Sequence, residues 1–116
     1  MKKGRIDPVL SAEVVNGVGG FTKLVNAFGV TVSSDYAYVA AVSSDALTII
    51  DISNPESPSL VAEIVNGVGG FTKLDGAYGV TVSGNYAYVT GVCSDALTII
   101  DISNPASPVL KAEIDL

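Results

Sequence analysis

The side chains most able to do chemistry in this chain are four carboxylates that come in two matched pairs. Asp45 and Asp51 are followed fifty residues later by Asp95 and Asp101. Carboxylate oxygens are ligands for hard cations such as Ca²⁺, so all four are candidate metal ligands. Asp51 and Asp101 each precede Ile-Ser-Asn-Pro, however, where a carboxylate accepts hydrogen bonds from turn amides. We favour turn roles for all four and expect no metal and no cofactor.

Residues for covalent catalysis are scarce. The chain has no histidine, which excludes Ser-His-Asp and Cys-His machinery and the usual zinc sites. The single cysteine, Cys93, stands where the other copy has Ser43, and we interpret it as an unreactive thiol. The glycine-rich segment 16–20 lacks the helix and the Lys-Ser/Thr pair of a phosphate-binding loop. The sequence therefore predicts a protein that is not an enzyme.

A repeat of fifty residues organises the whole chain. Residues 12–61 align with 62–111 without a gap, and 38 of the 50 positions are identical, which indicates recent duplication or deliberate symmetrisation. Residues 1–11 form a head, which contains the start of an additional copy of the last segment of the unit. Residues 112–116 form a tail, which continues the last segment of the second unit. A period near fifty is typical of a propeller blade or a solenoid unit.

Each unit has the pattern of four short strands. Val, Ile, Thr and Tyr, which favour strands, are concentrated in four segments separated by turn residues: 28–33, 36–42, 47–52 and 59–65. Ser34-Asp35 is expected to form a two-residue hairpin turn that accepts positive φ. The third segment is apolar on both faces, so we expect it to be covered on both sides. Four antiparallel strands joined by short turns make one propeller blade.

The residues also resemble a known family. Tyr36–Val39, Leu47–Pro55 and Pro58–Val61, with their counterparts in the second unit, are similar to the LVIVD repeat of bacterial and archaeal β-propellers. The resemblance implies an all-β propeller and an exported or cell-surface parent protein, and it is nearly silent on function. The linkers 16–24 and 66–74 are longer than this resemblance implies.

Two blades leave apolar faces without a partner, and repeat proteins need three or more units for a continuous core. We therefore expect homo-oligomerisation into a closed ring, with four chains and eight blades favoured over three chains and six. The head, with Lys2, Lys3 and Arg5, is expected to place its strand on a neighbour's last blade by strand exchange. The tail segment 110–116 would compete for that position, leaving one copy paired and the other frayed.

A binding module of an exported propeller is the alternative to a non-catalytic, self-assembling scaffold. Binding residues often lie in loops on a rigid scaffold. The two linkers are therefore candidate binding loops, and both are expected on the same rim of the ring. An equally good interpretation is that Phe21, like its counterpart Phe71, packs into the blade below and that the loop only covers the rim. The candidate residues are Phe21, Thr22, Lys23, Phe71, Thr72 and Lys73.

Tyr36 and Tyr38, like Tyr86 and Tyr88, alternate along the second strand of their unit. One tyrosine of each pair is expected to pack between blades with its hydroxyl satisfied, and an aromatic ligand platform is the alternative. The net charge of −6 argues against nucleic-acid binding. No apolar run approaches the length of a membrane span, and no signal peptide is recognisable. The localisation is therefore open: the protein is cytosolic, or its targeting segment is missing from the sequence.

Overall fold

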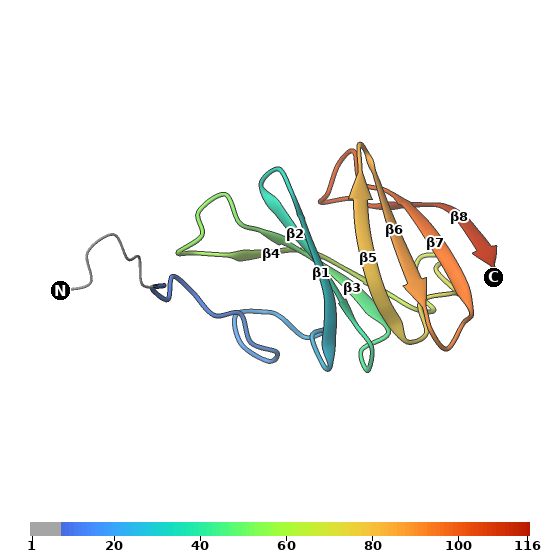
Figure 1. Cartoon of the computed structure of the whole chain (residues 1–116), viewed down its shortest axis with the longest axis horizontal. Helices are drawn as coiled ribbons and strands as arrows, with labels where there is room; N and C mark the ends of the chain where they lie inside the picture. The colour runs from blue at the N-terminus through green and yellow to red at the C-terminus, as the bar shows by residue number, and fades with distance from the viewer. Residues whose placement is uncertain (1–7) are drawn as a thin grey trace.

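The protein folds into two four-stranded antiparallel sheets. The structure is a computed structural model that describes residues 8–116. Each sheet is a meander in which strands adjacent in sequence are also adjacent in space (Figure 1). Blade 1 comprises β1 (Ala27–Ser33), β2 (Tyr36–Ala41), β3 (Ala46–Asp51) and β4 (Ser59–Val65); blade 2 comprises β5 (Ala77–Ser83), β6 (Tyr86–Gly91), β7 (Ala96–Asp101) and β8 (Val109–Asp115). The predicted all-β fold with propeller-type blades is confirmed.

The hairpin turns follow from the residues that the sequence places there. Ser34 has φ of 57° and Gly84, its counterpart, has φ of 58°. The next residue of each turn does not have positive φ, so only the first position needs a residue that tolerates the left-handed region. The β3 strand is buried along nearly its whole length, as its two apolar faces predict.

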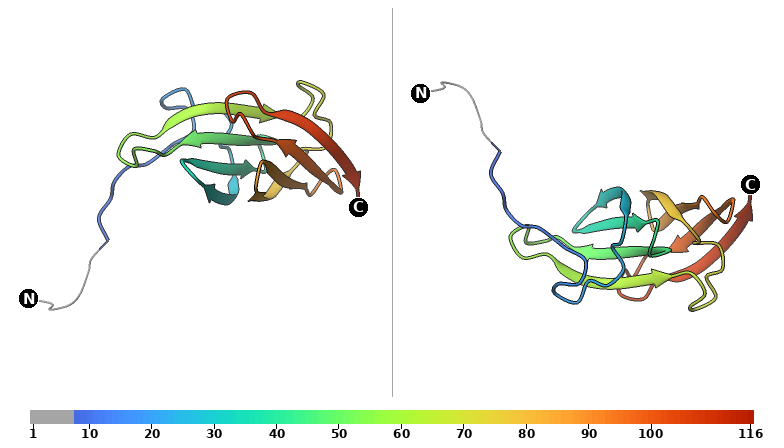
Figure 2. Two further views of the ribbon diagram at one scale, coloured as in Figure 1. Left: turned by 90° about the horizontal axis from the view of Figure 1, so that it is seen from above. Right: turned by 90° about the horizontal axis from the view of Figure 1, so that it is seen from below.

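The two sheets stack side by side, so that β1 and β2 of blade 1 pack against β5 of blade 2 (Figure 2). The backbones of β1 and β5 come closest at Gly29. A Cβ atom there would overlap the main-chain oxygen of Tyr78, so only glycine fits without a shift. The core between the sheets is made of side chains from both blades, chiefly Tyr38, Leu47, Ile49, Ile64, Leu74, Val89 and Ile100.

The two copies of the outer strand at the chain ends differ in structure. The tail copy is β8, which pairs with β7 from Ala96↔Asp115 to Asp101↔Val109. In the head, residues 8–14 form no strand and extend away from blade 1 on the side opposite blade 2 (Figure 2). Lys2, Lys3 and Arg5 lie outside the described residues.

The physical blades are out of phase with the sequence repeat. The two sheets span residues 27–65 and 77–115, whereas the frame 62–111 begins within β4 and ends within β8. Only strands occur as regular elements in residues 8–116, so this part of the chain contains no helix able to cross a membrane.

Candidate functional site: the two open blade faces

Every blade has two apolar faces, and one pair of faces is in contact within the chain. The leading face of blade 1, built from Tyr36, Tyr38, Ala40, Leu47, Ile49 and Ile64, packs on blade 2. The trailing face of blade 2, built from Val80, Val82, Ala87, Val89, Ile100 and Ile102, receives it. We call this contact the seam. Because the blades share their sequence, blade 2 also has a leading face and blade 1 a trailing face. No blade covers either of them within the chain, and we call them the open faces. The trailing face of blade 1 is exposed at Val30 and Val32, whereas Phe21, Leu24 and Val14 pack with its Ala37 and Ile50.

The open leading face of blade 2 repeats the residues that are buried at the seam. Ile64 is 3% exposed at the seam, whereas its counterpart Ile114 is 43% exposed. Tyr38 is buried and Tyr88 is only half-buried, and the same change occurs from Leu47 to Leu97. Their surroundings account for the difference, since the side chains are the same or nearly so.

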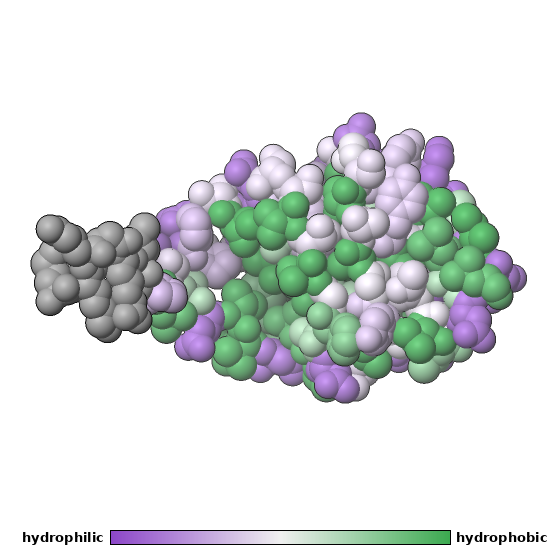
Figure 3. Space-filling view, viewed as in Figure 1, coloured by the Kyte–Doolittle hydropathy of each residue, from purple (hydrophilic) through white to green (hydrophobic). Residues whose placement is uncertain are grey.

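The open trailing face of blade 1 lies over β1. Val30 and Val32 are 65% and 60% exposed, whereas Val80 and Val82 are half-buried at the seam. Apolar surface is visible over β1 and again at the end of the molecule where β7 and β8 lie (Figure 3). Contiguous exposed apolar surface of this kind is typical of an interaction site.

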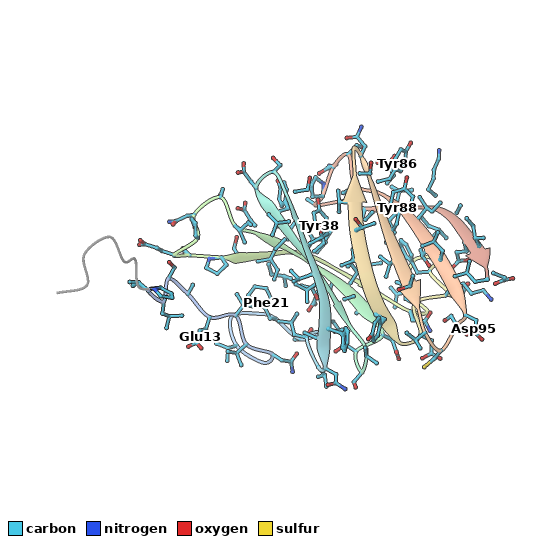
Figure 4. All side chains as sticks on the ribbon, in the orientation of Figure 1. Glu13, Phe21, Tyr38, Tyr86, Tyr88 and Asp95 are labelled. Carbon is cyan, nitrogen blue, oxygen red and sulfur yellow. The ribbon has the colours of Figure 1, made fainter. Side chains whose placement is uncertain are left out.

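Two further contacts fasten the seam. The Asp45 carboxylate oxygen Oδ1 accepts a hydrogen bond from the Gly76 amide at 2.8 Å, across the two blades. The rings of Phe28 and Tyr78 stack with their centroids 3.9 Å apart. Asp95 is the counterpart of Asp45 and lies at the β6–β7 turn (Figure 4), where it is exposed.

The linker loops are held to their own blades. Phe21, which is labelled in Figure 4, and Phe71 are each 5% exposed and belong to the two buried clusters. The hydroxyl and amide of Thr22 donate to the carboxylate of Glu63 at 2.9–3.1 Å, and Thr72 makes the same bonds to Glu113. These contacts agree with the interpretation of the loop as a seal.

The linker lysines differ in how they are held. Lys73 forms an ion pair with Asp115, with Nζ 3.4 Å from the carboxylate oxygen. Lys23 is half-buried, and its main-chain oxygen accepts a 3.4 Å hydrogen bond from the hydroxyl of Thr48.

The loop-to-strand pairing of Thr with Glu was not foreseen from the sequence. Thr22 and Glu63 are 41 residues apart, as are Thr72 and Glu113. A conserved spacing inside a repeat says only that both residues recur in each unit. It does not say that the linker folds back on the outer strand of the blade it leads into.

Asp51 and Asp101 cap the turns that follow their strands. The amide of Ser53 donates to Asp51 at 2.8 Å and its hydroxyl at 2.7 Å, and the amide of Ser103 donates to Asp101 at 2.9 Å. The Ser53 hydroxyl, followed by its amide, lowers the pKa of Asp51 from 3.8. The turn role is therefore what the structure shows for both residues.

The four candidate metal ligands are not brought together. Asp45 and Asp95 lie at the β2–β3 and β6–β7 turns, whereas Asp51 and Asp101 lie at the opposite ends of β3 and β7. Within residues 8–116 no group of three or more His, Cys, Asp or Glu side chains is placed to hold a metal ion.

The tyrosines divide according to blade. Tyr38 is 2% exposed between the blades, and burial followed by the neighbouring Tyr36 raises its pKa from 10.0. Tyr86 and Tyr88 are half-buried on the open face of blade 2 (Figure 4). Packing between blades is thus observed for the first pair, and the second pair occupies the equivalent positions without a neighbour.

Two stacked four-stranded meanders with a shared fifty-residue period define a β-propeller type of repeat protein. The sequence profile of the LVIVD repeat matches residues 26–65 and 76–115, which correspond to the two sheets. The chain therefore belongs to the LVIVD repeat family.

Among solved structures, the chain is similar to a functionally unknown protein from Desulfotomaculum acetoxidans DSM 771. The TM-score is 0.65 at 15% sequence identity, which supports the fold alone. The match covers 80% of this chain and 28% of that protein, so the chain spans little more than a quarter of its length. No curated protein matches the chain.

Proposed function

We propose that this chain is a non-catalytic scaffold that assembles with copies of itself, blade on blade. In the assembly, the leading face of blade 2 of one copy packs on the trailing face of blade 1 of the next. We call this contact the junction. One observation carries the proposal: the two open faces repeat, almost residue for residue, the two faces that already fit each other at the seam.

The apolar residues on the open faces supply the driving force. Each square ångström of apolar surface removed from water contributes roughly 25 cal/mol, and the exposed valines of β1 and Ile114 are placed to lose their hydration. The junction joins different faces, so it is a head-to-tail contact that either closes into a ring or continues as a filament. Repetition of the seam geometry favours a closed ring, and we propose four chains.

Strand exchange at the chain ends is part of the same proposal. The head repeats the outer strand: Leu10, Glu13 and Val14 correspond to Leu110, Glu113 and Ile114. Val14 packs against the buried cluster of Phe21, Ala37 and Ile50, as Ile64 packs against the cluster at the seam. The head thus lies toward the position that a preceding blade would fill, where the β8 of a neighbouring copy competes with it.

Light scattering coupled to size-exclusion chromatography tests the assembly. The chain has a mass of 11.8 kDa, and we expect a discrete multiple of that mass that persists on dilution through the micromolar range. A chain that remains at 11.8 kDa while folded would overturn the proposal.

The second candidate function is a binding module of a longer propeller. The observation in its favour is that the similar structure is much longer than this chain. In such a protein the open faces would contact further blades of the same polypeptide. A ligand screen that raises Tm while the mass stays at one chain would favour this candidate over the scaffold.

A further inference from the structure

Both residues of the polar contact at the seam have an equivalent residue at one of the open faces. At the seam, the half-buried Asp45 accepts the hydrogen bond from the buried Gly76 amide. The counterparts are Asp95 on blade 2 and Asn26 on blade 1, and both are exposed. Within residues 8–116 no hydrogen-bond acceptor lies at the Asn26 main-chain amide, and no donor lies at the Asp95 carboxylate.

The backbone geometry of the counterparts matches that of the seam. Asp45 and Asp95 have φ of 51° and 49°, so both turns place the aspartate in the left-handed region of the backbone. Gly76 and Asn26 have φ of 66° and 59°, so these two positions also share a left-handed backbone. Asparagine is one of the few residues other than glycine that adopts this region readily.

Resting on the scaffold function proposed above, we infer that Asp95 of one copy accepts a hydrogen bond from the main-chain amide of Asn26 of the next copy. We call this hydrogen bond the lock. It sets the register between the two blades at the junction and the direction in which the copies join. The partner that completes the site is therefore a second copy of this chain, bound through its blade 1.

The sequence differences around residue 26 fit this role. The side-chain amide of Asn26 donates to the Ser43 hydroxyl at 3.1 Å, so it is occupied within its own blade and leaves the main-chain amide to a partner. In blade 2, Cys93 replaces Ser43, and its sulfur lies 2.8 Å from where a Cβ of residue 76 would be. Asparagine therefore fits position 26 and only glycine fits position 76.

The charge next to the hydrogen-bonded amide also differs between the junction and the seam. The residue before Gly76 is Asp75, which places a second carboxylate in sequence next to the amide that Asp45 binds. The residue before Asn26 is Val25, which is uncharged. Asp95 therefore approaches its amide without a like charge on the adjoining residue.

The test compares Asp95→Gly, Asp95→Asn and Asp45→Gly in the full chain by sedimentation velocity over a concentration series. Glycine tolerates the positive φ at residue 95, so Asp95→Gly removes the acceptor without straining the turn. Hydrogen bonds to charged groups are worth enough that we expect the junction Kd of Asp95→Gly to rise by about tenfold or more. Asp95→Asn keeps an acceptor oxygen and is expected to lose less.

Asp45→Gly is the matched control, because it removes the same group from the seam. We expect it to lower Tm at dilute concentration, whereas Asp95→Gly leaves that Tm unchanged. Amide hydrogen exchange gives a direct second readout: assembly is expected to protect the Asn26 amide in the wild-type chain and in Asp95→Asn, but not in Asp95→Gly.

The outcomes distinguish a failure of the lock from a failure of the proposed scaffold function. If the wild-type chain never associates, the proposed function fails and the lock fails with it. If the wild-type chain associates while Asp95→Gly has the same Kd, or if the Asn26 amide gains no protection on assembly, the lock is overturned and the scaffold stands.

Discussion

Blade 1 and blade 2 have nearly the same sequence and the same fold, yet their equivalent side chains differ in exposure. Ile64 is 3% exposed and Ile114 43%; Ala77 is buried and Ala27 is exposed. The difference is confined to the faces that lack a neighbour. Phe21 and Phe71, which occupy equivalent positions in the two linkers, are buried equally at 5%.

This comparison teaches that each unit folds its own sheet but cannot bury both of its faces. The strand pairings and the threonine–glutamate contacts of the linkers lie within a single blade. The apolar faces become core only when another blade covers them, as in other repeat architectures. Paired substitutions at equivalent positions therefore separate the stability of the chain from the stability of its assembly.

The largest expected difference is between Ile64→Ala and Ile114→Ala. Truncating a fully buried isoleucine costs about 2–5 kcal/mol, so Ile64→Ala is expected to lower the unfolding free energy by that much. Ile114→Ala removes an exposed side chain and is expected to leave the unfolding of dilute chain nearly unchanged while raising the junction Kd. Urea unfolding and sedimentation velocity measure the two effects, and equal losses of stability would contradict the account.

The next pair tests the close approach of the inner strands. A Cβ at Gly29 overlaps the Tyr78 main-chain oxygen, so Gly29→Ala is expected to cost the chain about 1–3 kcal/mol through forced backbone shifts. Gly79 is its counterpart on the open face, where an added Cβ would lie 3.1 Å from the Thr90 hydroxyl oxygen and would meet no main chain of another blade. Gly79→Ala is expected to weaken assembly more than folding, as measured by light scattering and thermal unfolding.

The threonine–glutamate contact lies within each blade, so its removal should lower the stability of the chain equally in both blades. Glu63→Ala and Glu113→Ala each remove the acceptor for a threonine of the linker, and a hydrogen bond to a charged group contributes about 1.5–3 kcal/mol. We expect similar losses of stability from both variants in chemical unfolding. A loss confined to one blade would show that the linker contacts depend on the neighbouring blade.

The smallest effect concerns the aspartates that cap the turns. The pKa of Asp51 and Asp101 is lowered in the folded chain, so their contribution to stability is present above the unfolded pKa of 3.8 and is lost as the pH falls through the lower folded values. The largest cause is the Ser53 hydroxyl for Asp51 and the Ser103 amide for Asp101. Ser53→Ala should therefore raise the first pKa more than Ser103→Ala raises the second, measured by NMR titration of the carboxyl carbons.

The blades themselves could be predicted because their signals are local. Alternation of Val, Ile, Thr and Tyr marks each strand, and the turn residues Ser34-Asp35 and Asn54-Pro55 separate them. The roles of Asp51 and Asp101 were also predictable, because the donors lie two residues further along the chain.

The seam could not be derived in detail because its partners are distant in sequence. The Asp45 carboxylate meets an amide 31 residues away, and the sequence marks Asp45 only as a turn residue. Likewise, the repeat does not say which side of each strand the next blade covers. That choice depends on how the linker carries the chain from β4 to β5, and the Phe71 and Leu74 of this linker are buried in one cluster with side chains of both blades.

Native mass spectrometry of the wild-type chain tests the central claim most directly, since it counts the chains in each assembly. We expect one closed species that contains four copies of the 11.8 kDa chain and that dissociates into single chains only below the micromolar range. Folded single chains at every concentration, or an open-ended series of masses without a closed maximum, would contradict it.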